Sequence, residues 1–188
     1  MPKLVNHETR RRELAQALWR VVFRDGVDAV SVRSVAAEAG WSSGALRHYF
    51  PDQRELIAAA MRLVTDHIAA RIQALEPEGT LEEKAVAYFE QLLPLDEARR
   101  TEAEVWFSFV TRARLEPKLA SLTRAVNGEL RGFISSILAQ FPIDDPTAPG
   151  RMHALIDGLC LHLLLYPEAV TPADARAQVR AELSGMLR

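Results

Sequence analysis

The segment 43–49 contains residue types that suit contact with nucleic acid, namely Ser43, Gly44, Arg47, His48 and Tyr49. Arg47 is long enough to donate two hydrogen bonds to the O6/N7 edge of a guanine, or to clamp a phosphate. The small residues at 43–45 allow a helix backbone to approach base edges closely. His48 and Tyr49 flank the arginine and are placed to donate to phosphate oxygens, which positions a protein on DNA. The residues alone leave both roles of Arg47 open.

Two short helices are needed to position these side chains. Ser31 is the expected N-cap of a helix over 32–39, and Gly40 ends that helix in a left-handed turn. Ser42 is the expected cap of a second helix over 43–49. Isolated helices of this length are unstable in water, so tertiary packing must hold both. A helix, a tight glycine turn and a second helix are the pattern of a helix-turn-helix, whose second helix enters the DNA major groove.

Apolar side chains of both short helices are expected to pack on a preceding helix over 8–25. Leu46 and Phe50 lie four residues apart and face inward, which leaves the polar groups outside. The free N–H groups at the helix starts near Ser31 and Gln53 add anion sites. The predicted core of this region consists of Val35, Ala36, Ala39, Trp41, Leu46 and Phe50, packed on Leu18 and Val22.

The rest of the chain also has helical period without sustained strand alternation, so we predict an all-α protein. Asp52 with Glu55 resembles a capping box for a long connecting helix, and Thr80 with Glu83 forms another. The polar, proline-rich segment 142–150 indicates a loop. The further helices are predicted over 53–75, 81–93, 97–114, 117–141, 151–166 and from Thr171-Pro172 onward.

Charge divides the chain into a basic front and an acidic rear. Residues 1–50 hold eight Lys/Arg and five Asp/Glu, a net charge of +3, whereas the remaining residues hold 15 and 20, a net charge of −5. Such asymmetry suggests two tasks in one chain. The single cysteine, Cys160, excludes an intrachain disulfide and zinc-finger spacing. The N-terminus lacks a signal-peptide core, and the longest apolar run, 159–166, is far shorter than the roughly 20 residues of a membrane span, so we expect a cytoplasmic protein without membrane contact.

The stretch "VSVRSVAAEAGWSSGALRHYFPDQRELIAAAM" resembles the DNA-binding region of the TetR family of bacterial transcriptional repressors. The family pattern is a helix opened by Ser or Thr, followed by "-IA--AGVS-G-LY-HF--K--L". The similarity covers the first quarter to third of the chain. The matching positions are Ser31, Val35, Ala36, Ala39, Gly40, Ser42, Gly44, Leu46, Tyr49, Phe50 and Leu56.

The resemblance implies a helix-turn-helix DNA-binding domain over 1–52, followed by the start of a connecting helix 53–75, and a helical ligand-binding and dimerisation domain over 53–188. It also implies which side chains of the first domain face bases and which meet phosphates. Arg33 with residues 43–45 would face bases, and Tyr49 with the start of the connecting helix would meet phosphates. With the residues singled out above, the predicted DNA-binding set is Ser31, Arg33, Ser42, Ser43, Gly44, Ala45, Arg47, His48, Tyr49 and Gln53.

Three positions depart from the family pattern. Arg47 stands where the family usually has tyrosine, which makes a guanine contact or an extra phosphate contact possible. Gln53 stands where lysine is usual, so one phosphate contact is expected to be weaker. Trp41 replaces a smaller apolar residue and is expected to alter the packing of the turn.

The rear of the chain has the helix order of the ligand-sensing and dimerising half of TetR regulators, and weakly resembles the subgroup of betaine/choline-pathway regulators. Apolar residues at helical spacing, with Gly128 and Gly132 allowing close approach, favour a homodimer built from helices 117–141 and 151–166. The alternative is that helix 151–166 is buried wholly within its own protomer. Two-fold symmetry implies a palindromic double-stranded DNA operator, read by two helices about 34–36 Å apart or a multiple of that. The predicted interface residues are Leu122, Val126, Leu130, Phe133, Ile137, Ile156, Leu159 and Leu163.

Aromatic residues gather in two segments of the rear half. A pocket between their helices and helix 53–75 would suit an apolar or aromatic small-molecule effector, although ordinary core is the alternative role of each residue. Effector binding is expected to displace helix 53–75 and to lower operator affinity, so that a repressor is released from DNA. The predicted pocket residues are Tyr88, Phe89, Trp106, Phe107 and Phe109.

Metal and catalytic sites are not predicted. His153 and Asp157 lie four apart with His162 nearby, but they lack the further ligands of a metal site. Cys160 is expected to be a small buried hydrophobe. Ser42 and His48 lie close in sequence, but no acid is placed to orient the histidine. We therefore predict no cofactor and no enzymatic activity; the alternative to a DNA-binding regulator is a helical ligand-binding or interaction protein without DNA binding.

Overall fold

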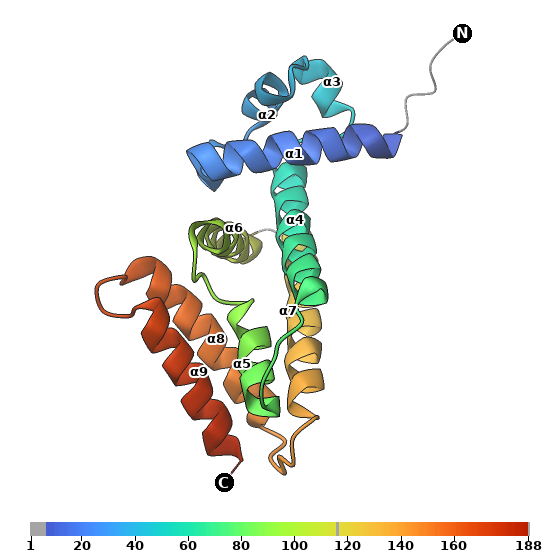
Figure 1. The fold of residues 1–188 in the computed structure, drawn as a ribbon. Coiled ribbons are helices and arrows are strands. Elements are labelled where there is room, and N and C mark those ends of the chain that lie inside the picture. Colours follow the sequence, from blue (N-terminus) through green and yellow to red (C-terminus); the bar gives the residue numbers. More distant parts are fainter. Residues whose placement is uncertain (1–6, 116, 188) are drawn as a thin grey trace. The chain divides into compact units, whose positions relative to one another are not determined.

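The structure, a computed structural model, describes residues 7–115 and 117–187, and that part of the chain is all-helical without strands (Figure 1). This confirms the predicted fold class. The elements are α1 (His7–Asp25), the 3-10 helix η1 (Val27–Ala29), α2 (Val32–Ala39), α3 (Ser43–Arg47), α4 (Gln53–Ala74), α5 (Leu81–Glu90), α6 (Glu97–Ala113), α7 (Pro117–Leu138), α8 (Ala148–Leu165) and α9 (Pro172–Met186).

The helix starts follow the capping residues that the sequence contains. Thr80 and Glu83 form a reciprocal capping box at α5, and Thr171 forms one with Asp174 at α9. Asp52 accepts a hydrogen bond from the backbone N–H of Glu55 at 3.1 Å, which is half of the predicted box. Because a cap side chain bonds a specific N–H of the first turn, the sequence predicts starts better than ends.

Several predicted helix ends were wrong. α3, α5 and α7 end two to three residues earlier than predicted, in turns that the periodicity did not distinguish from helix. α8 begins at Ala148, inside the segment 142–150 that was predicted to be a loop. Pro149 explains this difference, because proline fits the first turn of a helix, where its missing N–H has no partner to lose.

The contacts divide the chain into two compact units. The first contains the described residues up to Asp66 together with Glu104–Ala120, and the second contains His67–Ala103 and Ser121 onward. Helices α4, α6 and α7 each contribute to both units. The predicted border between residues 52 and 53 falls within the first unit, because the N-terminal part of α4 belongs to the core of that unit.

The core of the first unit joins the two short helices to α1, on which α2 packs (Figure 1). Gly40 ends α2 with φ 70°, the left-handed turn that was predicted. Ala39 and Trp41 are only half-buried, although both were predicted in this core. The buried side chains include Leu14, Leu18, Val21, Val22, Val35, Ala36, Leu46, Phe50, Leu56, Ile57 and Met61.

The second unit packs α5 and α8 against α9 (Figure 1). Arg100 of α6 donates to the carbonyl oxygens of Leu163 and Leu164, at 3.1 and 3.0 Å, and so satisfies the C-terminal end of α8. Arg176 of α9 pairs with Glu90 of α5 at 3.2 Å. The buried apolar residues of this unit include Ala85, Val86, Phe89, Leu93, Ile134, Met152, Ile156, Leu159, Ala175, Val179 and Leu183.

Candidate nucleic-acid interface

The short helix α3 presents polar and small groups because its apolar side chain turns inward. Leu46 is fully buried and Phe50, just beyond the helix, is nearly so. Gly44 and Arg47 are exposed, and Ser43 is half-buried. Ala45 and His48 are also exposed, and Tyr49 is half-buried. The predicted outward-facing residues therefore do lie at the surface of one short segment.

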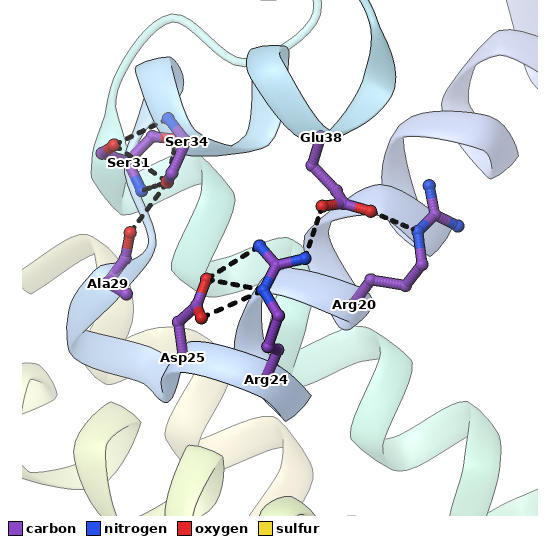
Figure 2. A network of polar contacts seen from close by, with 7 residues as sticks. All are labelled: Arg20, Arg24, Asp25, Ala29, Ser31, Ser34 and Glu38. Atoms are coloured by element: carbon purple, nitrogen blue, oxygen red, sulfur yellow. Dashed lines mark hydrogen bonds and ion pairs between the residues drawn. The ribbon is translucent and has the colours of Figure 1, made fainter.

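Two of the predicted serines act as helix caps. The Ser42 hydroxyl accepts the backbone N–H of Ala45 at 3.2 Å. At α2, Ser31 accepts the N–H of Ser34 at 3.0 Å, while Ser34 Oγ accepts the N–H of Ser31 at 2.9 Å and donates to the carbonyl of Ala29 at 2.7 Å (Figure 2). These bonds fix the starts of both short helices.

Gln53 has a structural task that the sequence did not reveal. Its side-chain amide donates to the carbonyl oxygen of Val30 at 2.8 Å, which ties the start of α4 to the end of η1, just before the N-cap of α2. One of its two amide N–H donors is therefore already used. The distance of 23 residues along the chain between the two partners explains why no local pattern predicted this bond.

Glu38 of α2 is held by two arginines of α1 (Figure 2). Arg20 Nε donates to one carboxylate oxygen at 2.7 Å, and Arg24 Nη1 donates to the other at 2.8 Å. Arg24 also pairs with Asp25 at 2.8 Å. Hydrogen bonds from Arg20 and then Arg24 favour the ionised carboxylate and lower the pKa of Glu38. The network fixes α2, and through the glycine turn α3, on α1.

Ion pairing leaves few basic groups for an external anion. Within the described part of residues 7–50, Arg10 pairs with Glu13, and Arg20 and Arg24 pair as above. Arg33 on α2 and Arg47 on α3 are exposed and have no recorded ion pair. Because unpaired guanidinium groups keep all their donors for phosphate or guanine, Arg33 and Arg47 are the strongest candidates among these five arginines for contact with an anion.

The residues predicted to form an effector pocket are divided between the two units. Phe89 of the second unit and Phe109 of the first are fully buried core residues, so neither is presented to a ligand. Trp106 and Phe107 are half-buried in the first unit. Aromatic character alone did not distinguish pocket from core, because both need large apolar side chains.

Tyr88 does line a cavity, which lies within the second unit. Its volume is about 520 Å³, and its walls come from the segment that follows α4, from α5, and from α7 with the turn after it. The rings of Tyr88 and Phe133 meet edge to face with centroids 6.5 Å apart. The lining residues are Leu75, Glu76, Pro77, Leu81, Lys84, Ala85, Tyr88, Phe133, Ser136, Ile137, Gln140 and Phe141.

A nearly buried carboxylate joins α4 to α6 inside the second unit. Glu102 binds Arg71 through both oxygens, at 2.6 and 2.7 Å, and Arg71 also donates to the carbonyl of Gln91 at 3.1 Å. His67 Nδ1 lies 3.5 Å from the same carboxylate. A bidentate pair shielded from water is the kind of charge interaction that holds helices in one arrangement.

Part of the predicted dimer interface is internal to the protomer. Ile137, Ile156, Leu159 and Leu163 have 5, 1, 3 and 4% of their surface exposed in the single chain, so the protomer itself covers these four side chains. The face of α8 that holds Ile156, Leu159 and Leu163 is buried within its own protomer, as the alternative for helix 151–166 expected, and α9 packs on α8. Leu122, Val126, Leu130 and Phe133 of α7 are half-buried, and Phe133 lines the cavity.

The titratable groups of α8 do not gather into a metal site in the described part of the chain. In the part of the chain that the structure describes, no three His, Cys, Asp or Glu side chains gather as metal ligands would. The Nε2 atom of His153 lies 3.6 Å from the Oδ2 atom of Asp157. Burial, with a smaller effect of Asp157, raises the pKa of Cys160 to about 12, so its thiol is protonated at neutral pH. Among the same described residues, no helix is long and apolar enough to cross a membrane.

The geometry of the first unit, two short capped helices joined by a left-handed glycine and held on α1, defines a helix-turn-helix protein. Comparison with known proteins agrees. Residues 14–60 match the family described as bacterial regulatory proteins, tetR family, and residues 81–188 match the BetI-type transcriptional repressor C-terminal domain. The chain belongs to the TetR family of helix-turn-helix transcriptional regulators and is not an enzyme. The match to BetI-type repressors confirms the weak resemblance of the rear half.

Relatives and solved structures give the same assignment. The HTH-type transcriptional regulator PksA of Bacillus subtilis (strain 168) is 38% identical over 176 residues, which cover 90% of this chain and 86% of PksA. The crystal structure of a transcriptional regulator from Rhodococcus sp. Rha1 has a TM-score of 0.82 and 33% identity, covering 94% of this chain and 95% of that one. The multidrug binding protein EbrR complexed with ethidium has a TM-score of 0.68 and 28% identity, covering 95% and 99%.

Proposed function

We propose that this regulator reads its operator with the exposed face of α3, assisted by Arg33 of α2. The observation that carries the proposal is that Arg33 and Arg47 are exposed without an ion pair, whereas Arg10, Arg20 and Arg24 of α1 are each paired with a carboxylate. Ser43, Gly44 and Ala45 are small enough for base edges to approach the α3 backbone. Tyr49 and the backbone N–H groups at the start of α4 supply phosphate contacts, while Ser31 and Ser42 position the helices as caps.

The experiment first selects bound fragments from the source genome and then measures their affinity in a binding titration, with fluorescence anisotropy as the readout. Wild-type affinity should fall steeply with salt, because phosphate contacts release counterions. Arg47→Ala should cost about 1–3 kcal/mol and relax the preference at one base position if the arginine reads a base. Tyr49→Phe should weaken binding to all DNA sequences alike. Uniform weakening by Arg47→Ala assigns a phosphate role instead, and salt-independent or absent binding rejects the proposal.

We further propose a homodimer on a palindromic operator. Its interface is built from α9 and from a face of α8 other than the face that holds Ile156, Leu159 and Leu163. On α9, Ala173, Ala177, Ala181 and Gly185 recur every four residues and are exposed. On α8, Ala154 and Leu165 are exposed on one stripe with the half-buried Leu161. Small residues on one stripe allow helix axes to approach closely. Two protomers related by a two-fold axis would cover these stripes with each other and leave no apolar surface of the stripes exposed.

Light scattering tests the proposed dimer. The wild-type protein should be a dimer at micromolar concentration, and Ala181→Arg should shift it toward monomer, because a charged side chain at the close approach of two helices cannot be accommodated without desolvation. Ala69→Arg on the exposed surface of α4 is the matched control and should leave the dimer unchanged. A monomeric wild-type protein, or an Ala181→Arg variant that dimerises as tightly as the wild type, would rule out this interface.

We propose that the 520 Å³ cavity of the second unit binds the effector, an aromatic cation. The complexes of EbrR with ethidium and proflavin suggest this class of ligand, and Tyr88, Phe133 and Phe141 supply aromatic walls beside Glu76. Because Leu75 and Glu76 directly follow α4, a ligand in the cavity would act on the helix that leads back to the DNA-binding unit. Displacing α4 would lower operator affinity and release a repressor, a coupling between two sites.

Ethidium fluorescence provides a direct test of the cavity. Tyr88→Ala and Glu76→Gln should each weaken ethidium binding, whereas Lys84→Gln, which removes the positive charge from the same lining, should not. Weakening by Lys84→Gln with no effect of Glu76→Gln would indicate an anionic ligand instead. We place the protein in the cytoplasm, where its operator lies. We assign DNA binding to residues 1–52, which share a compact unit with the start of α4, and ligand binding and dimerisation to residues 53–188.

A further inference from the structure

Trp41 stands at the centre of a contact between α1 and the segment that follows α3. The guanidinium carbon of Arg10 lies 5.1 Å from the centroid of the Trp41 ring. The Tyr49 ring meets Trp41 edge to face, with centroids 5.6 Å apart and planes at 69°. His48 in turn packs edge to face on Tyr49 at 5.7 Å. A large ring that was expected in the core is therefore half-buried beside the side chains of the DNA-binding surface.

The interactions of Arg10 leave its donors available to an anion. Its ion pair with Glu13, at 2.9 Å, joins side chains that are 39% and 47% exposed, and water screens such a pair strongly. The attraction to Trp41 is to the face of the ring and does not consume the N–H groups of the guanidinium. Trp41 therefore restricts where Arg10 lies without occupying its hydrogen-bonding edge.

We propose that Trp41 is a positioning residue for DNA binding, which holds Arg10 and Tyr49 side by side so that both donate to phosphates of the same backbone segment. The inference rests on the proposed use of α3 to read the operator. A small apolar residue at position 41 offers no ring face to Arg10, which would then lose more side-chain freedom on binding a phosphate. Arg10 thus adds a phosphate contact from α1 to those of the helix-turn-helix.

The number of phosphates contacted is measurable from the salt dependence of affinity. Each neutralised phosphate adds about one to the magnitude of the slope of log K against log salt concentration. A side chain that only packs the turn would change affinity without changing that slope. The slope therefore separates a positioning role of Trp41 from a merely structural one.

The experiment compares Trp41→Leu, Arg10→Gln, the double variant and Trp41→Phe by anisotropy, each on a selected operator fragment and an unrelated duplex. Trp41→Leu and Arg10→Gln should each weaken binding about two- to fivefold per protomer, on both duplexes, and lower the slope by about one per protomer. The double variant should lose no more slope than either single variant. Trp41→Phe keeps a ring and should retain most of the slope. Arg176→Ala, which removes an arginine of the second unit, should change neither quantity.

Three results would overturn the inference. Trp41→Leu could weaken binding with an unchanged slope, which would leave Trp41 a packing role only. The slope of the double variant could fall by the sum of the two single-variant changes, which would show that Arg10 and Trp41 act independently. Arg10→Gln, an exposed substitution that leaves the core intact, could leave the slope unchanged. Wild-type protein that binds no selected fragment would reject the proposed function itself, and the positioning role with it.

Discussion

The two units of this regulator differ in how their working residues relate to the core. In the first unit, the groups proposed to contact DNA are polar or small and lie outside, while apolar neighbours such as Leu46 point inward. In the second unit, the protein core, the proposed partner-facing stripes and most of the cavity wall consist of apolar or small residues, and only a few cavity residues, such as Glu76 and Lys84, are polar. The spacing of residues therefore separates function from packing in the first unit and fails to do so in the second.

The largest effect is expected where a predicted pocket residue proved to be core. Phe89→Ala should destabilise the protein by about 4 kcal/mol, because it removes a fully buried ring and leaves a cavity. Chemical denaturation at fixed protomer concentration measures this. Tyr88→Ala, the neighbouring change at the cavity wall, should cost far less stability while weakening ligand binding. Equal losses of stability in the two variants would mean that Tyr88 is as much a core residue as Phe89.

A second comparison concerns charge. Glu102→Gln should cost about 3 kcal/mol, because it leaves the Arg71 guanidinium without its counter-charge in a shielded position. Arg176→Ala breaks the more exposed pair with Glu90 and should cost less than about 1 kcal/mol. The same denaturation experiment applies. If Glu102→Gln proves no more costly than the control, the Arg71–Glu102 pair does not hold α4 on α6.

The smallest effect is expected at the exposed network that fixes α2 on α1. Because Arg20 and Arg24 lower the pKa of Glu38 below 4.5, its contribution to stability is present above that pH and is lost as the pH falls through the folded-state pKa. The stability difference between wild type and Glu38→Gln should therefore be largest at neutral pH and shrink toward pH 3. Glu78→Gln, at an exposed site, is the control. A difference that is constant with pH would mean that the ionised carboxylate is not what the arginines recognise.

These differences follow from what a sequence pattern encodes. Helical period and caps are local, so the pattern predicted the fold class, the serine caps at residues 31 and 42, the turn at Gly40 and the inward side of α3. Interactions between distant parts of the chain were missed: α9 covers the face of α8 that was assigned to a partner, and Gln53 bonds Val30. Trp41 was predicted to be core because an apolar residue was expected to be buried, and its contact with Arg10, which lies 31 residues earlier, could not be read from a local pattern.

Gly44 offers a test of whether the exposed face of α3 enters the DNA groove. A Cβ added there would meet only Ser42 Oγ, at 3.9 Å, and the residue has ordinary helical backbone, so Gly44→Leu should fold with unchanged or slightly higher stability. Ala69→Leu on α4 is the control for an added exposed leucine.

Fluorescence anisotropy of Gly44→Leu on the selected operator is the most direct measurement. We expect Gly44→Leu to lose at least about tenfold in affinity, about 1.4 kcal/mol, at undiminished stability, because the leucine would stand between the α3 backbone and the base edges. Wild-type affinity in a correctly folded Gly44→Leu protein would contradict this expectation.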